Sequence, residues 1–135
     1  MQIVPRSERV EIRPAAKGTP MAKYMLLIYG NEQRWENLSA QESAEIDAGH
    51  VAFQKRAGDR ILASGQLEAS STATTLRAGD ADSPAVTDGP FLETKEVLGG
   101  FYLLEAADLD EAISLVSGLT EVSHDHSGVE IRPLM

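Results

Sequence analysis

Two segments of the chain are apolar on both faces when they are read as β-strands. Residues 23–30 and residues 100–106 carry large apolar side chains at successive positions, so that both sides of each strand are apolar. The side chains concerned are Tyr24, Met25, Leu26, Leu27, Ile28 and Tyr29 in the first segment, and Phe101, Tyr102, Leu103 and Leu104 in the second. A strand of this kind must be covered on both faces, which places both segments inside a sheet and not at a solvated surface.

Two helices are predicted between the strands. Ser39 followed by Glu42 forms the pattern of a capping box, and the helix that it starts is expected to run to about Ala57 and to end at Gly58. A second helix is expected over residues 109–118, after the N-cap Asp108.

Further strands are predicted at residues 60–69, 72–77, 85–87 and 129–133, with a hairpin loop at residues 78–84. The resulting order, β-α-β-(β-hairpin)-β-α-β, is α+β and ferredoxin-like. Two helices cover only one face of such a sheet. The other face is apolar in the central strands and needs a partner, so we expect a homodimer whose sheets pack face to face.

Composition limits the function classes. The chain has 135 residues, a formal net charge of −9 and no cysteine. The charge disfavours direct binding to nucleic acid, and the missing cysteines exclude disulfides and thiolate chemistry, so a cytoplasmic protein is expected. The sequence predicts no membrane span and no signal peptide. Residues 1–22 are predicted to be a flexible extension and residues 23–135 the domain.

One repeat lies partly in that extension. Residues 10–14 and residues 129–133 have the same sequence, VEIRP. Either the repeat is chance, or residues 1–20 derive from the end of a related upstream domain or from a start codon placed too early.

The densest cluster of charge is the stretch TDGPFLETKE at residues 87–96, which contains three carboxylates, the first of them Asp88, and one lysine, Lys95. An Asp-Gly-Pro turn opens it, and Gly99-Gly100 follows before the apolar strand. Charges this dense beside a core strand belong to a solvated turn or to a site.

This stretch resembles the signature of the DGPF (YCII-related) family, and the resemblance extends over residues 23–133. Matching landmarks are Lys23-Tyr24-Met25, Phe53, Gly65, Gly99-Gly100-Phe101, Asp110-Glu111-Ala112 and residues 129–133. The resemblance implies a dimeric α+β barrel, and a His–Asp pair at the active site proposed for YCII-like relatives. One branch of the family includes a dehydrochlorinase, and DGPF members are often found beside sigma factors.

His50 and Asp88 are the candidate catalytic residues. His50 lies on the apolar helix face with Phe53, where a histidine is either a core residue with a satisfied hydrogen bond or a general base. Asp88 either accepts backbone amides in its turn or orients His50. Under the second interpretation, the Asp88 carboxylate should reach a ring nitrogen of His50 directly or through one water, within a subunit or across the dimer.

Glu93, Lys95 and Phe91 are candidate substrate-binding residues, with a solvated ion-pair cluster as the alternative for the charged two. His124 and His126 have a spacing that suits a metal pair on a strand, but they lie in an expected loop, so no metal site is predicted. No phosphate loop or dinucleotide fingerprint is present, and no cofactor is expected.

Three functions follow from these residues. The first is a cofactor-independent, lyase-like enzyme in which His50 and Asp88 transfer a proton. The second is a non-catalytic ligand-binding or regulatory dimer that acts in sigma-factor systems. The third is a structural dimer in which the motif serves only the fold. A pocket that contains both His50 and Asp88 favours the first, a pocket without them the second, and no pocket the third.

Overall fold

The computed structural model describes residues 21–80, 82–92 and 94–135. Nearly all of the predicted extension, including the repeat at residues 10–14, lies outside the described residues. Within the described part of the chain, no helix is long and apolar enough to cross a membrane.

A four-stranded antiparallel sheet forms the centre of the fold. Its strand order is β2-β5-β1-β6, and its strands are β1 (Ala22–Asn31), β2 (Ile61–Gln66), β5 (Glu96–Ala106) and β6 (Ser127–Pro133). The two segments that are apolar on both faces pair with each other at the centre of the sheet, which confirms the expectation from their pattern. The order matches a ferredoxin-like α+β fold with an inserted hairpin, as predicted.

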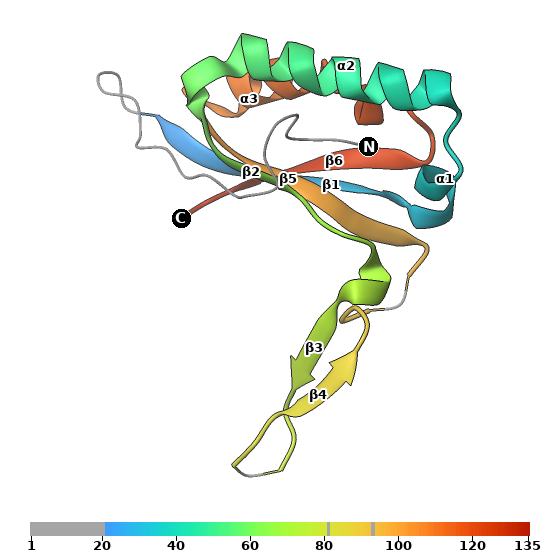
Figure 1. Ribbon diagram of the computed structural model, residues 1–135. Helices are drawn as coiled ribbons and strands as arrows, with labels where there is room; N and C mark the ends of the chain where they lie inside the picture. The colour runs from blue at the N-terminus through green and yellow to red at the C-terminus, as the bar shows by residue number, and fades with distance from the viewer. Residues whose placement is uncertain (1–20, 81, 93) are drawn as a thin grey trace.

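Helices α2 (Ala40–Ala57) and α3 (Leu109–Val116) both cover the same face of this sheet (Figure 1). The predicted capping box starts α2: the Ser39 hydroxyl accepts from the Glu42 amide at 3.1 Å, and the Glu42 carboxylate accepts from the Ser39 amide at 3.2 Å. Gly58 ends the helix with φ of 57°, a conformation that favours glycine. Asp108 caps α3, as expected.

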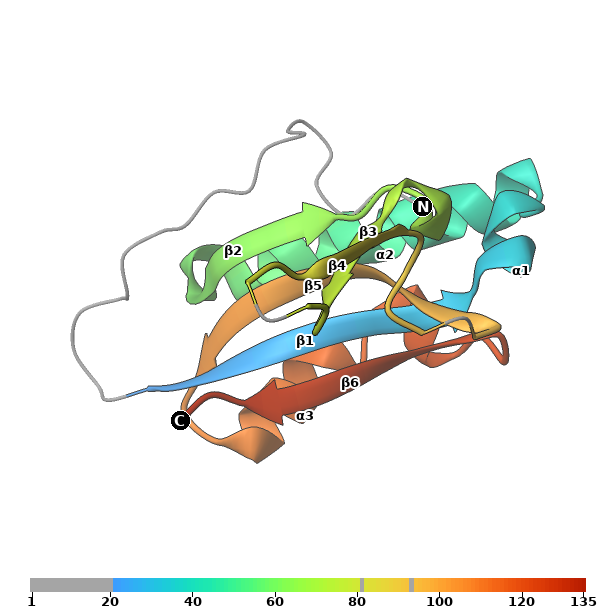
Figure 2. The same cartoon turned by 90° about the horizontal axis from the view of Figure 1, so that it is seen from below.

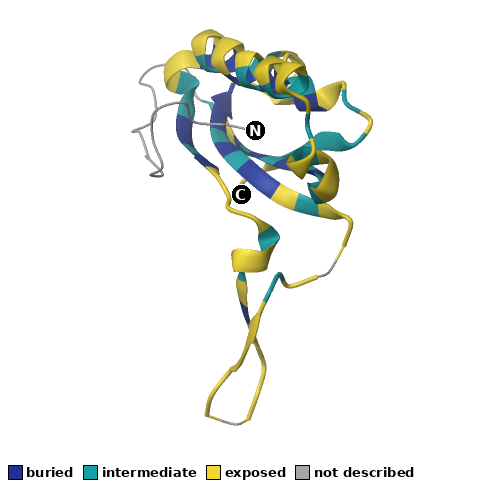
Figure 3. Cartoon of the chain, turned by 45° about the vertical axis from the view of Figure 1, so that its right-hand side comes forward, coloured by how far each residue is buried: buried dark blue, intermediate teal, exposed yellow. Residues whose placement is uncertain are grey.

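The hydrophobic core lies between these helices and the sheet (Figure 3). It contains the side chains of one face of β1 and of β5, together with apolar residues of the two helices. Its largest fully buried members are Tyr102, Phe53, Leu26, Ile28, Ile46, Leu104 and Leu119. The core therefore accounts for one face of each two-sided strand.

Within residues 21–80, 82–92 and 94–135, no α-helix covers the opposite face of the sheet (Figure 1). Met25 lies opposite Leu103, and Leu27 opposite Phe101, so these four side chains share that face, and each is only half-buried in the single chain.

The inserted hairpin consists of β3 (Thr74–Arg77) and β4 (Ala85–Asp88) and projects from this helix-free side (Figures 1 and 2).

Short elements join the main ones and include features that the sequence did not reveal. Helix α1 (Glu32–Glu36) follows β1 directly and was not predicted. The predicted strand at residues 60–69 ends earlier, at Gln66, because the chain turns there into the 3-10 helix η2 (Ser70–Thr72). Two further 3-10 helices are η1 (Gly58–Arg60) and η3 (Thr120–Val122).

Candidate functional site

His50 lies on the buried face of α2. The predicted stripe is confirmed: Ile46, His50 and Phe53 are fully buried, and Ala57 is nearly so. Helical spacing places these side chains one above another, toward the sheet. His50 therefore reaches the core and has no exposed surface.

Both ring nitrogens of His50 have partners inside the core. Nδ1 lies 2.8 Å from the Tyr102 hydroxyl, and Nε2 lies 2.6 Å from Oε2 of Glu121. Gln54 donates from Nε2 to the Tyr102 hydroxyl oxygen at 3.2 Å. With Gln54 as a donor, the phenol hydrogen is available to His50 Nδ1, so Nε2–H donates to the Glu121 carboxylate.

Tyr102 keeps its proton in this arrangement. Burial raises the pKa of its hydroxyl far above the ordinary value for tyrosine, and the nearby negative charge of Glu121 raises the pKa further. Tyr102 thus acts as a hydrogen-bond donor to His50 throughout the neutral range.

Close packing of η3 on α2 positions Glu121. A Cβ on Gly49 would lie 2.3 Å from the Thr120 hydroxyl oxygen, so glycine permits this approach. The Thr120 hydroxyl donates to the Glu45 carbonyl at 3.0 Å. Glu121 is fully buried, and among the described residues its Oε1 has no hydrogen-bond partner.

Asp88 lies elsewhere. It is the last residue of β4, in the projecting hairpin, and it is exposed. The predicted contact between Asp88 and His50 is not formed in the subunit, where Glu121 takes the position expected for Asp88. A contact between Asp88 and His50 across a dimer stays a prediction; within one subunit, both ring nitrogens of His50 have other partners.

Phe91 and Lys95, the other predicted site residues that the structure describes, are exposed and have their contacts away from His50. Phe91 is 60% exposed, and the Arg77 guanidinium lies over its ring at 3.9 Å from the centroid. Lys95 is exposed, and its carbonyl accepts from the Glu32 amide at 3.4 Å. Glu93 lies outside the described residues.

His124 and His126 lie in the loop between η3 and β6, with ring centroids 4.9 Å apart. Nδ1 of His124 and Nε2 of His126 are buried and have no hydrogen-bond partner among the described residues. No group of three or more potential metal-ligating side chains is found in the described part of the chain.

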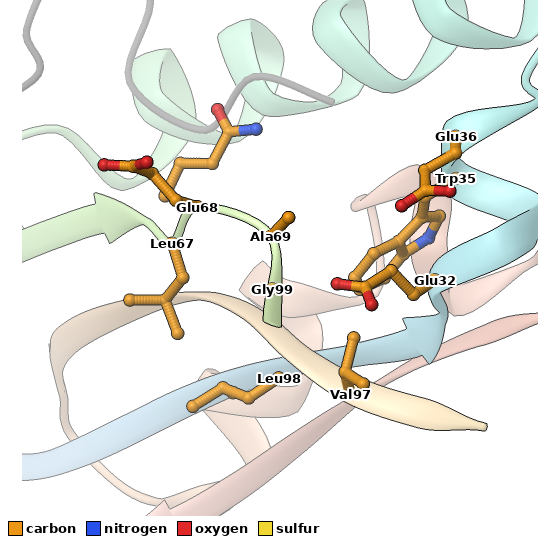
Figure 4. Close-up of a pocket in the computed structure, with 10 residues that line it drawn as sticks. Glu32, Trp35, Glu36, Leu67, Glu68, Ala69, Val97, Leu98 and Gly99 are labelled. Carbon is orange, nitrogen blue, oxygen red and sulfur yellow. The ribbon is translucent and has the colours of Figure 1, made fainter. Parts of the chain in front are cut away.

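A pocket of about 190 Å³ opens at a different place, between α1, the end of β2 and the start of β5 (Figure 4). Neither His50 nor Asp88 lines it. Its lining residues are Glu32, Trp35, Glu36, Gln66, Leu67, Glu68, Ala69, Val97, Leu98 and Gly99.

Two of these residues, Glu32 and Trp35, are fixed by hydrogen bonds to residues that do not line the pocket. The Glu32 carboxylate accepts from the Ser70 amide at 2.8 Å and from the Ser70 hydroxyl at 2.5 Å. These hydrogen bonds lower the pKa of Glu32, so its side chain is ionised at neutral pH. Trp35 donates from Nε1 to the Ser127 hydroxyl at 2.9 Å, and its ring lies against Gly30, where a Cβ would meet it at 2.3 Å.

The partners of His50 and the residues of α1 that line the pocket were not identified from the sequence. Tyr102 was read only as an apolar strand residue, Glu121 as part of a loop, and α1 with Glu32 and Trp35 was not predicted. A usable signal exists for Trp35 alone, because it is the single tryptophan of the chain and follows the N-cap residue Asn31 by four positions.

Comparison with known proteins places the chain in a family. The YCII-related domain matches residues 22–135. An uncharacterized protein of Rhizobium meliloti (strain 1021) is 34% identical over 113 residues, which cover 82% of this chain and 90% of that protein. The match spans the whole described sheet and both covering helices, as the resemblance at residues 87–96 predicted. The chain therefore belongs to the YCII-related domain family.

Proposed function

We propose that this protein is a homodimeric small-molecule-binding domain whose ligand occupies the pocket beside α1. The observation that carries the proposal is that the pocket beside α1 and the buried His50 lie at different places in the fold. The pocket is open and is lined by side chains directed to it from three elements, whereas His50 is enclosed and has both nitrogens bonded. A histidine in that state serves the fold.

The lining of the pocket suits a small ligand. Val97 of β5 lies near the indole of Trp35, Leu67 and Leu98 lie across the pocket from it, and the carboxylates of Glu32, Glu36 and Glu68 also belong to the lining (Figure 4). Ligand sites in proteins combine an apolar lining with a few placed polar groups. The volume lies below the roughly 300–1,000 Å³ of sites for drug-sized molecules, so the ligand is smaller than those.

The single tryptophan makes the proposal directly testable. Because Trp35 is the only tryptophan, protein fluorescence excited at its absorption edge reports on this pocket alone. A screen of small metabolite-like compounds should find ligands that change Trp35 emission and saturate. Saturable ligands that stabilise the protein without any change at Trp35 would place the binding site elsewhere.

The homodimer is proposed from the helix-free face. Met25, Leu27, Phe101 and Leu103 form an apolar strip there that only a second layer would cover. Leu98, which lines the pocket, lies opposite Tyr29 in the same strand pair, so the pocket borders this face. A second copy packed on the strip would lie next to the ligand.

Light scattering tests the dimer. At micromolar concentration, the protein should have twice the mass of one chain. Leu27→Asp should produce a monomer or an unfolded chain, because it would bury an unpaired charge in the interface. Val51→Asp is the matched control, since Val51 is 40% exposed on the solvent side of α2. A stable monomer in the unaltered protein would end this proposal.

A second candidate is proton transfer at His50, with Glu121 in the role that was predicted for Asp88. The observation that favours it is the row of hydroxyl, imidazole and carboxylate formed by Tyr102, His50 and Glu121. It requires that the core opens to admit a substrate. Modification by diethyl pyrocarbonate decides between the two: the proposed binding domain predicts that His50 reacts far more slowly than His124 and His126, and equal rates would favour the catalytic candidate.

A further inference from the structure

Among the described residues, the charged side chains that line the pocket are all acidic. Glu32, Glu36 and Glu68 line it, and in the part of the chain that the structure describes no lysine, arginine or histidine is among the lining residues. The whole chain carries a formal net charge of −9, which raises the local concentration of cations. A ligand with a carboxylate or phosphate would meet repulsion here.

Glu32 presents a fixed negative charge. Ser70 occupies one hydrogen-bonding position on each of its carboxylate oxygens. A carboxylate has about four such positions, so positions remain on Glu32 for a donor from the pocket. Figure 4 shows this carboxylate directed into the space between Trp35 and Val97.

Trp35 and the leucines provide the apolar part. The indole N–H is bonded to Ser127, which fixes the ring at the pocket wall and leaves a face of the ring for a ligand. A cation over an indole face is attracted by the ring quadrupole. Leu67 and Leu98 are 43% and 36% exposed, and they leave an apolar surface on the other side of the pocket.

These features together define a ligand. We infer that the pocket selects a small organic cation, an ammonium group attached to a compact apolar body, with the ammonium directed to Glu32 and Trp35 and the body against Leu67 and Leu98. This inference rests on the proposed function, because it names the class of molecule that the same pocket takes.

Three probes of almost equal size isolate the role of charge. Benzylammonium, benzyl alcohol and benzoate share the aromatic ring, and their polar groups are positively charged, neutral and negatively charged. Trp35 fluorescence should show the tightest binding for benzylammonium, weaker binding for benzyl alcohol and the weakest for benzoate. Added salt should weaken benzylammonium binding and leave benzyl alcohol unchanged.

Glu32→Gln sharpens the test, because the amide oxygen still accepts from Ser70. The variant should bind benzylammonium about tenfold more weakly and benzyl alcohol as before. Asp59→Asn is the matched control: it removes one exposed charge that does not line the pocket and should change neither affinity.

The outcomes separate the two claims. If benzyl alcohol or benzoate binds as tightly as benzylammonium, or if Glu32→Gln weakens both probes equally, the pocket binds ligands but the cation inference is wrong. If none of the three probes changes Trp35 emission at millimolar concentration while unrelated compounds do, the cation inference is again wrong and the proposed function stands. If no compound of any class acts on Trp35, both are wrong.

Discussion

Glu121 and Glu32 are both glutamates in short helical segments next to the sheet, but one is enclosed in the core and the other lines an open pocket. Glu121 is fully buried and bonded to His50, another member of the core. Glu32 is bonded to Ser70 on one side and faces an open pocket on the other. The chain completes the surroundings of His50 from within, whereas Glu32 lines a pocket that is open.

Substitutions around His50 and substitutions at the pocket should therefore differ in their effect on the free energy of unfolding. Removing one member of a buried, bonded pair leaves the other without a partner in a medium of low polarity. Removing a carboxylate from a solvated pocket wall leaves groups that water can bind. The first kind of change should therefore lower the free energy of unfolding, and the second should mainly alter binding.

The largest effect is expected for Glu121→Ala. It should lower the free energy of unfolding by about 3 kcal/mol, because His50 Nε2 loses its buried partner. Glu68→Ala, at the exposed rim of the pocket, is the matched control and should cost about 0.5 kcal/mol or less. Urea unfolding followed by circular dichroism measures both. Equal losses of unfolding free energy in the two variants would show that the buried Glu121 contributes no more to stability than the exposed Glu68.

Tyr102→Phe should have an intermediate effect of about 1–3 kcal/mol, because His50 and Gln54 both lose a hydrogen-bond partner in the core. It should also change the response to alkaline pH. The pKa of Tyr102 is raised in the folded state, so its contribution to stability is full below the unfolded value of about 10 and is lost as the pH rises above it.

Unfolding at about pH 8 and about pH 10.5 measures this response. The unaltered protein should lose more stability between the two values than Tyr102→Phe does. The same loss in both proteins would mean that the Tyr102 hydroxyl is not held in its neutral form by the core.

The smallest effect on stability is expected for Ser70→Ala, at less than about 1 kcal/mol. The variant removes the hydroxyl hydrogen bond to Glu32 and keeps the backbone one. The pKa of Glu32 should therefore rise toward its ordinary value. In the unaltered protein, the lowered pKa contributes stability that is present above the unfolded pKa and is lost as the pH falls through the folded pKa, and Ser70→Ala should reduce that loss.

NMR titration of the Glu32 carboxyl carbon measures this shift. A Glu32 pKa that is unchanged in Ser70→Ala would show that the serine does not fix the charge at the pocket wall.

The fold was predictable because its signals are local. The capping box at Ser39 and Glu42, the N-cap Asp108 and the two-sided apolar strands each report on their own segment, and antiparallel pairing of the strands follows from their order. Even the burial of His50 was predictable, since the residue lies on a helix face with Phe53.

The partners of His50 could not be predicted in the same way. Glu121 lies 71 residues from His50 and Tyr102 lies 52 away, and neither pairing leaves a local pattern in the chain. The burial of a glutamate is rare enough that a loop position was the natural interpretation of Glu121. Asp88, in contrast, has a strong local motif, but the motif positions it in the projecting hairpin.

A single NMR titration tests most directly whether a ligand binds at the pocket beside Trp35 and not at the buried network of His50. Benzylammonium is added to the isotope-labelled protein, and the Trp35 indole N–H and the His50 ring signals are followed together. Our account predicts a saturable shift at Trp35 while the His50 signals stay in place. A shift at His50 with none at Trp35 would contradict it, because the ligand would then act at the buried network and not at the pocket.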